Sequence, residues 1–167
     1  MKQIQPANHI DQLIRQTRVY HVQLSMMADS KTSMLLTMSS IIITLAISKL
    51  TEPQFRFASA ILMLSCLITI VICCVTVMPN LRKRSTDQKA KNLLFFNDFA
   101  SLSYDEYQDQ MHTMMSDPTL CYESQLKEIY QAGNYLYHRK YPLLRMAYIV
   151  FFTGFVLASV QLLFTLF

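Results

Sequence analysis

Aromatic, amide and basic side chains gather in the polar part of this chain between residues 92 and 145. Aromatic rings can stack on a nucleobase, an amide can hydrogen-bond to the edge of the base, and Arg or Lys can neutralise a phosphate. These side chains together have the chemistry that a small nucleotide pocket needs. The candidate ligand-binding residues are Asn92, Phe95, Phe96, Asn97, Phe99, Tyr107, Arg139, Lys140, Tyr141 and Arg145.

The same residue types also have a purely structural interpretation. Buried aromatic rings would hold a helical bundle together, and basic residues beside a membrane would follow the rule that cytoplasmic loops are positive. Both interpretations stay open. The sequence contains no Walker loop, nucleophile elbow or paired-carboxylate motif, and its histidines and cysteines have no metal-ligand spacing. We therefore predict no catalytic residue, no metal and no cofactor.

Apolar runs border the polar part that contains these side chains: residues 34–50 and 55–78 precede it, and residues 146–167 follow it. Each is close to or above the roughly 18 to 20 residues that a helix needs to cross about 30 Å of hydrocarbon. Charged residues are almost absent from the runs, although they make up 16% of the chain. The sequence thus predicts an integral membrane protein with transmembrane helices at 32–50, 55–78 and 146–167.

Basic residues predict the orientation of these helices. Residues Arg82, Lys83, Arg84, Lys89 and Lys91 follow the second run, and three of the candidate ligand residues precede the third. Because cytoplasmic loops carry an excess of Lys and Arg, we expect residues 1–31 and 79–145 to face the cytoplasm and the C-terminus to lie on the other side.

The N-terminal segment has the pattern of a helix that continues into the first span. Apolar residues recur there at steps of three and four, and no helix breaker stands between Asn8 and Leu50. This predicts a rod of about 40 residues, roughly 60 Å long. A signal received at one end of such a rod could move the other end.

The sequence between the second and third spans also indicates helices. We expect one helix over residues 89–100, and a second that begins at a capping box of Ser103 and Glu106 and ends before Asp117. Asp117 and Pro118 would start a third helix, which Pro142 would break or kink. The predicted fold is an all-α membrane protein whose cytoplasmic helical bundle comprises residues 1–31 and a sensor region at 79–145.

Hydroxyl side chains form a stripe on one face of the first span. The stripe consists of Ser33, Thr37, Ser40, Thr44 and Ser48. The second span repeats the pattern with Ser65, Thr69, Cys73 and Thr76, and the third carries Gly154 and Ala158. Such stripes can line a water-filled path in an oligomer, or let helices pack closely. Packing and pore lining both remain open for these faces.

Three blocks of the sequence resemble the transmembrane effector domain of Pycsar systems. The blocks are ADSKTSMLLTMSSIII, NLLFFNDFASLSYDEY and YLYHRKYPLLRMAY, with FF-x-x-F-A and K-Y-x-L-L-R as their most specific parts. The resemblance extends from about Met26 onward. Asn97 departs from it, because the family blocks often have Gly there. Pycsar systems are bacterial antiphage systems in which a pyrimidine cyclase makes cyclic CMP or cyclic UMP.

The resemblance implies an antiphage effector in the bacterial inner membrane, with a cytoplasmic N-terminus and a periplasmic C-terminus. Its partners would be a cyclic pyrimidine mononucleotide, the lipid bilayer, further copies of the chain and, functionally, a nucleotidyl cyclase, but no nucleic acid. Asp29 and Lys31 at the membrane entrance match the family, as do most of the candidate ligand residues. These two could couple the sensor to the spans, or form an interfacial ion pair with each other.

Other functions are compatible with the same pattern. The chain could be a pore-forming or membrane-perturbing effector gated by another messenger or by a partner protein, or a membrane scaffold that senses nothing. A membrane enzyme fits less well, because no acid, base or nucleophile is positioned recognisably. Titration with different cyclic nucleotides would separate these possibilities.

Overall fold

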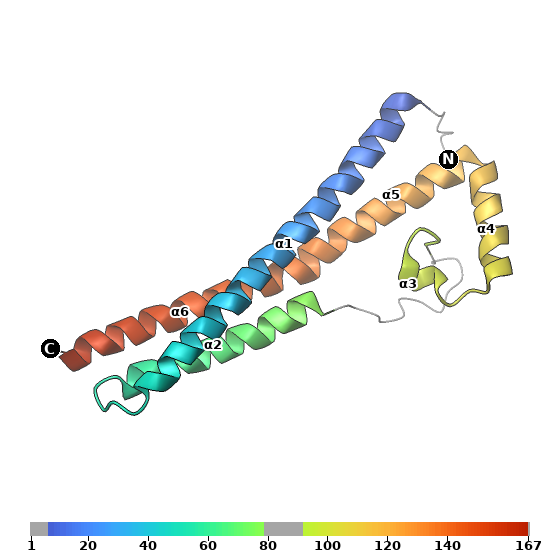
Figure 1. Ribbon diagram of the computed structural model, residues 1–167. Helices are drawn as coiled ribbons and strands as arrows, with labels where there is room; N and C mark the ends of the chain where they lie inside the picture. Colours follow the sequence, from blue (N-terminus) through green and yellow to red (C-terminus); the bar gives the residue numbers. More distant parts are fainter. Residues whose placement is uncertain (1–6, 79–91, 167) are drawn as a thin grey trace. The chain divides into compact units, whose positions relative to one another are not determined.

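The structure, a computed structural model, describes residues 7–78 and 92–166. Arg82, Lys83, Arg84, Lys89 and Lys91, on which the predicted orientation partly depends, lie outside the described residues, as do the side chains of Phe96 and Asn97. The described chain is helical, and no strand occurs in those ranges. The elements are α1 (Asn8–Lys49), α2 (Arg56–Val77), α3 (Phe96–Phe99), α4 (Tyr104–Ser116), α5 (Pro118–Tyr135), a π-helical turn (Leu136–Lys140) and α6 (Tyr141–Leu166), as drawn in Figure 1.

The all-α class is confirmed, and three of the described helices are long and apolar enough to cross a membrane: Asn8–Lys49, Arg56–Val77 and Pro118–Thr165. The chain divides into two compact units. The polar unit comprises residues 1–24 and 79–135, and the apolar unit comprises residues 25–78 and 136–167. Helix α1 belongs to both units.

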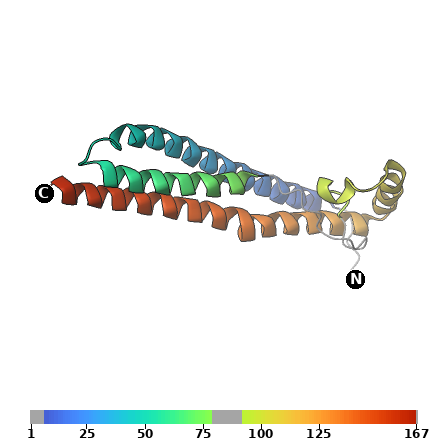
Figure 2. The same cartoon turned by 90° about the horizontal axis from the view of Figure 1, so that it is seen from below.

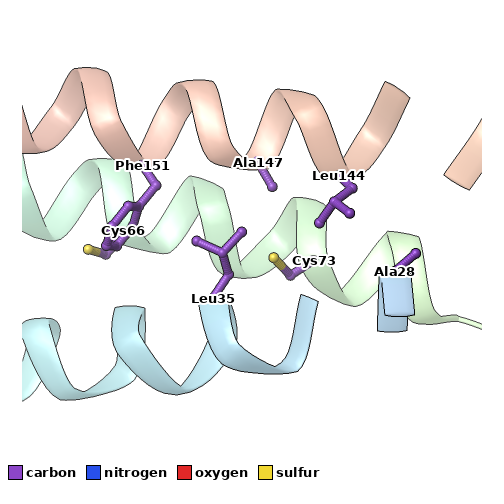
Figure 3. Packing of buried hydrophobic residues seen from close by; sticks show 7 residues of the cluster. All are labelled: Ala28, Leu35, Cys66, Cys73, Leu144, Ala147 and Phe151. Carbon is purple, nitrogen blue, oxygen red and sulfur yellow. The ribbon is translucent and has the colours of Figure 1, made fainter. Parts of the chain in front are cut away.

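Small and medium-sized side chains pack α1, α2 and α6 together in the apolar unit. The three helices lie side by side in both views (Figures 1 and 2), and α1 connects to α2 through a short turn after Lys49. Figure 3 shows α2 between the other two, with side chains from α1 and α6 pointing toward it. The buried cluster consists of Ala28, Leu35, Cys66, Cys73, Leu144, Ala147 and Phe151.

The hydroxyl stripe of α2 faces this packed interior. Ser65, Thr69 and Thr76 are buried, and each donates a hydrogen bond to a carbonyl of its own helix at 2.8 to 2.9 Å. Gly154 of α6 lies against Ser65 so closely that an added Cβ would be 2.0 Å from the Ser65 Oγ. The second stripe therefore packs helices together, as small residues commonly do in membranes.

A series of side-chain contacts joins α1 and α5 in the polar unit. The Tyr122 hydroxyl donates to Asp11 Oδ1 at 2.6 Å, Arg18 Nη2 donates to Glu128 Oε1 at 2.7 Å, and Gly133 lies beside the His21 ring. The hydrogen bond to the Asp11 carboxylate, with smaller contributions from burial, raises the pKa of Tyr122. Residue numbers increase together along both helices, so α1 and α5 run in the same direction here.

Two predicted helix starts in the polar unit are confirmed. Ser103 and Glu106 form the capping box of α4, with each side chain accepting from the backbone N–H of the other residue. Helix α4 ends at Ser116, and Pro118 begins α5 while Asp117 Oδ1 accepts from the Thr119 N–H at 2.8 Å. Local polar side chains thus fix these boundaries.

The predicted helix over residues 89–100 is wrong where the structure describes it. Residues 92–95 form turns, and only Phe96–Phe99 is helical. Asn92 Oδ1 accepts from the Leu94 N–H at 3.1 Å, and Asp98 Oδ2 accepts from the Asn92 N–H at 3.0 Å. Side chains of this kind offer the backbone an alternative to helical hydrogen bonds, which explains the short helix.

Of the two expected effects of Pro142, a break or a kink, the break does not occur, because the chain remains helical from Pro118 to Thr165. The turn just before it, Leu136–Lys140, is π-helical. A proline ring clashes with the carbonyl four residues earlier, and that carbonyl belongs to His138 inside the wider turn. The π-helical turn therefore accommodates the proline without ending the helix.

The close contact at Gly154 predicts a specific compensation. Gly154→Ala should lower the stability of the purified protein by about 1 to 3 kcal/mol, because the new Cβ would overlap both the Cβ and Oγ of Ser65. Adding Ser65→Gly removes both atoms and should recover part of the loss. Thermal unfolding in detergent measures the effect, with Thr153→Ala, at an exposed neighbouring position, as control. A Gly154→Ala variant as stable as the parent would contradict the packing described here.

Candidate functional site

The predicted ligand residues fall into two groups, one in each unit. The polar-unit group consists of Asn92, Phe95, Phe96, Asn97, Phe99 and Tyr107, and the apolar-unit group consists of Arg139, Lys140, Tyr141 and Arg145.

Asn92 is the centre of the polar-unit group. It is only 2% exposed, its backbone N–H and side-chain oxygen are used in the turn, and its Nδ2 is buried without a hydrogen bond. Asp98, which the sequence did not single out as a ligand residue, is also buried and holds this turn closed. A buried amide donor without an acceptor is uncommon and can serve a ligand carbonyl.

Two aromatic rings lie in the same group. The Phe99 and Tyr107 ring centroids are 5.0 Å apart with a tilt of 43°, which joins α3 to the first turn of α4. This distance is within the favourable range for aromatic pairs. The rings therefore stabilise the segment whether or not one of them also stacks on a base.

Lys140 dominates the apolar-unit group. Its side chain is 7% exposed, and its Nζ donates to Asp29 Oδ2 and to Ser25 Oγ, both at 2.7 Å. A buried ammonium needs such partners, because removing it from water without them is costly. The π-helical turn ends at Lys140, so this contact ties α1 to the beginning of α6.

The neighbouring cations differ from Lys140 in accessibility. Arg139 and Arg145 are exposed, and Tyr141 is partly buried against the core of the apolar unit. Tyr137 is 73% exposed, and its ring meets the His138 ring edge to face at 4.8 Å. Within this group, Arg139 and Arg145 are the cations open to an anion from solution.

Asp29 pairs with Lys140 and not with Lys31. The alternative of an ion pair between Asp29 and Lys31 is therefore wrong, because residues two apart on a helix do not face each other. Lys31 is exposed. Lys140 is 111 residues from Asp29 in sequence, so no local spacing reveals this pair, and no sequence feature identifies Ser25 as its third member.

The hydroxyl stripe of α1 is exposed along its whole length. Four of its five members donate to backbone carbonyls of their own helix, at 2.7 to 3.0 Å: Thr37, Ser40, Thr44 and Ser48. The buried residues of this helix, such as Leu35 and Ser39, occupy the opposite side. The stripe does not pack against the other helices that the structure describes, and pore lining or contact with another copy stays a prediction.

A family model described as the Pycsar effector protein domain matches residues 12–166. No curated protein and no solved structure matches the chain. The matched region includes both groups of candidate residues, the Asp29–Lys140 pair and the apolar parts of the three helices that can cross a membrane. With nearly its full length covered, the chain belongs to the Pycsar effector family and is a membrane-associated effector of antiphage defence.

Proposed function

We propose that this effector senses a cyclic pyrimidine mononucleotide, cyclic UMP or cyclic CMP, and then impairs the bacterial inner membrane as a homo-oligomer. The family match over residues 12–166 carries the proposal, because a Pycsar effector responds to the product of a pyrimidine cyclase. The cytoplasmic part would comprise residues 1–31 and 79–145, and the C-terminus would lie in the periplasm.

Both groups of candidate residues have chemistry suited to such a messenger. Asn92 Nδ2 is a free donor for a carbonyl of the pyrimidine ring, and Phe99 and Tyr107 offer aromatic faces in the same unit. In the apolar unit, Arg139 and Arg145 are exposed, and guanidinium groups bind phosphate oxygens strongly.

Membrane impairment requires more than one copy of the chain. Three spans cannot enclose a water-filled pore, so copies must assemble. The α1 hydroxyl stripe faces outward from its own chain, and its hydrogen bonds to the helix backbone limit the cost of contact with lipid. In an assembled, active state the same hydroxyls would line a polar path.

Helix α1 would couple sensing to the membrane. It is continuous from Asn8 to Lys49, and it contacts α5 through Asp11 in the polar unit and Lys140 through Asp29 in the apolar unit. To shift an equilibrium from 1:99 to 99:1, the messenger must favour one state by about 5.5 kcal/mol. The Asp29–Lys140 pair is a discrete contact on which such a preference can act.

Calorimetric titration of the purified protein with cyclic UMP, cyclic CMP, cyclic AMP and cyclic dinucleotides tests the sensing step. We expect heat only with a cyclic pyrimidine mononucleotide. Arg139→Ala and Arg145→Ala should each weaken binding about 10-fold or more, because each removes a charged hydrogen-bond donor. Asn92→Ala tests the polar-unit group. The control is Arg15→Ala, because Arg15 is an exposed cation of α1 outside both groups of candidate residues.

Ion leakage from liposomes that contain only the protein tests the membrane step. The proposal expects leakage only when the bound messenger is present. Leakage triggered by a different nucleotide would favour the alternative effector, and a protein that neither binds nor leaks with any cyclic nucleotide would contradict the proposed function.

The coupling contact predicts the behaviour of three variants. Asp29→Asn leaves a buried ammonium without a counter-ion and should destabilise the protein by about 3 kcal/mol. Lys140→Met should cost less, because the Asp29 carboxylate that it leaves unpaired is 44% exposed and can be hydrated. The reversed pair, Asp29→Lys with Lys140→Asp, should recover part of this loss. Thermal unfolding in detergent gives the stabilities, and liposome leakage shows whether messenger response is lost. Additive effects in the reversed pair would argue against a direct contact.

Thiol accessibility distinguishes the uses of the α1 stripe. With Cys74 and Cys121 replaced by Ser, we expect a water-soluble thiol reagent to modify Ser40→Cys and Thr44→Cys about 10-fold faster or more after messenger is added, by analogy with a wetted pore. Met38→Cys, which is also exposed but lies on another side of α1, is the control. Equal rates with and without messenger would show that the stripe does not line a path.

A further inference from the structure

The packing of the apolar unit changes along its length. At Gly154, α6 contacts α2 so closely that no Cβ fits. One turn farther along α6, toward the end that carries the α1–α2 turn, the three helices enclose an open groove of about 280 Å³. All three contribute small residues to its wall: Ala46 from α1, Ala58 and Ser59 from α2, and Ala158 and Ser159 from α6.

The wall of this groove is almost entirely apolar, with larger side chains such as Leu62, Phe155 and Leu162 completing it. In a water-soluble protein, an engineered apolar cavity of about 150 Å³ stays dry and binds benzene. A groove of this size within a helix bundle that crosses a membrane borders hydrocarbon instead. The apolar molecule that can enter the groove from the membrane is a lipid acyl chain, and the groove volume is sufficient for a segment of such a chain.

A charged pair stands at the mouth of the groove. Lys49, which is part of the wall, places its Nζ 2.7 Å from Glu52 Oε1 and 5.6 Å from the centre of the Phe55 ring. Both charged side chains are substantially exposed, at 53% and 40%, and exposed ion pairs contribute little to stability. A ligand that carries one negative and one positive charge can therefore replace the internal pair at small cost.

We propose that the groove binds one phospholipid with a zwitterionic, amine-bearing headgroup. The acyl chain fills the space between α1, α2 and α6, the phosphate contacts Lys49, and the headgroup ammonium contacts Glu52. A second copy of the chain fits this space poorly, because an α-helix with its side chains is about 10 Å wide. The bound lipid separates the three helices at this end, while the contact between Gly154 and Ser65 keeps α6 close to α2 farther in.

Native mass spectrometry of the full-length protein, reconstituted in vesicles of phosphatidylethanolamine and phosphatidylglycerol and released into mild detergent, counts retained lipids. Ala58→Leu places a larger side chain in the groove and should reduce retention of one lipid per chain at least about 10-fold, because that side chain occupies volume that the acyl chain needs. Ala60→Leu adds the same atoms at an exposed position of the same helix and should retain the lipid.

Lipids with different headgroups test the charged pair of Lys49 and Glu52 at the mouth of the groove. The parent protein should retain phosphatidylethanolamine in preference to phosphatidylglycerol, and Glu52→Gln should remove that preference while the acyl chain remains bound. If Ala58→Leu fails to fold in a thermal scan, Ser159→Leu fills the same groove from α6.

Equal lipid retention in the Ala58→Leu and Ala60→Leu variants overturns the proposal. So does a parent protein without headgroup preference. Cross-linked dimers that disappear in Ala58→Leu while lipid retention is unchanged would show that a second copy, and not a lipid, occupies the groove. None of these outcomes depends on a messenger, so the experiments test the lipid site independently of the proposed sensing function.

Discussion

The structure depends on the fact that hydrocarbon offers no hydrogen bonds to a polypeptide backbone. Each apolar run must satisfy its own N–H and C=O groups, and a helix does so within a single segment. Helices in lipid gain little from the hydrophobic effect when they associate, so close contact and small side chains decide how they pack. The contact between Gly154 and Ser65 shows this most clearly, because only a missing Cβ permits it.

One charged side chain, that of Lys140, is buried in the apolar unit. Lys140 is buried at the end of a π-helical turn and is held by Asp29 and Ser25 of α1. Such a pair is weak evidence for added stability, since desolvation offsets much of its attraction, but breaking it is costly. A contact of this kind therefore favours one defined arrangement of α1 and α6, which is what a membrane effector needs if it is to have distinct resting and active states.

Two hydroxyl stripes with similar spacing have opposite environments. That of α2 faces inward and lies under Gly154, whereas that of α1 faces away from its own chain. In both stripes, most of the hydroxyls donate hydrogen bonds to carbonyls of their own helix. Burial inside one chain leaves the α2 stripe with a packing role, while the exposed α1 stripe remains available to lipid, to another copy or to water.

Length, apolar periodicity and capping residues determined much of this protein from sequence alone. They predicted the continuous helix from Asn8, the α4 capping box at Ser103 and the α5 start at Pro118, because these features depend on neighbours within a few residues. Asn92 and Asp98 shortened one predicted helix through side-chain hydrogen bonds that propensity does not reveal. The partner of Asp29, the direction of each hydroxyl stripe and the groove beside Ala58 required the tertiary structure, since each depends on which helices meet and at what rotation.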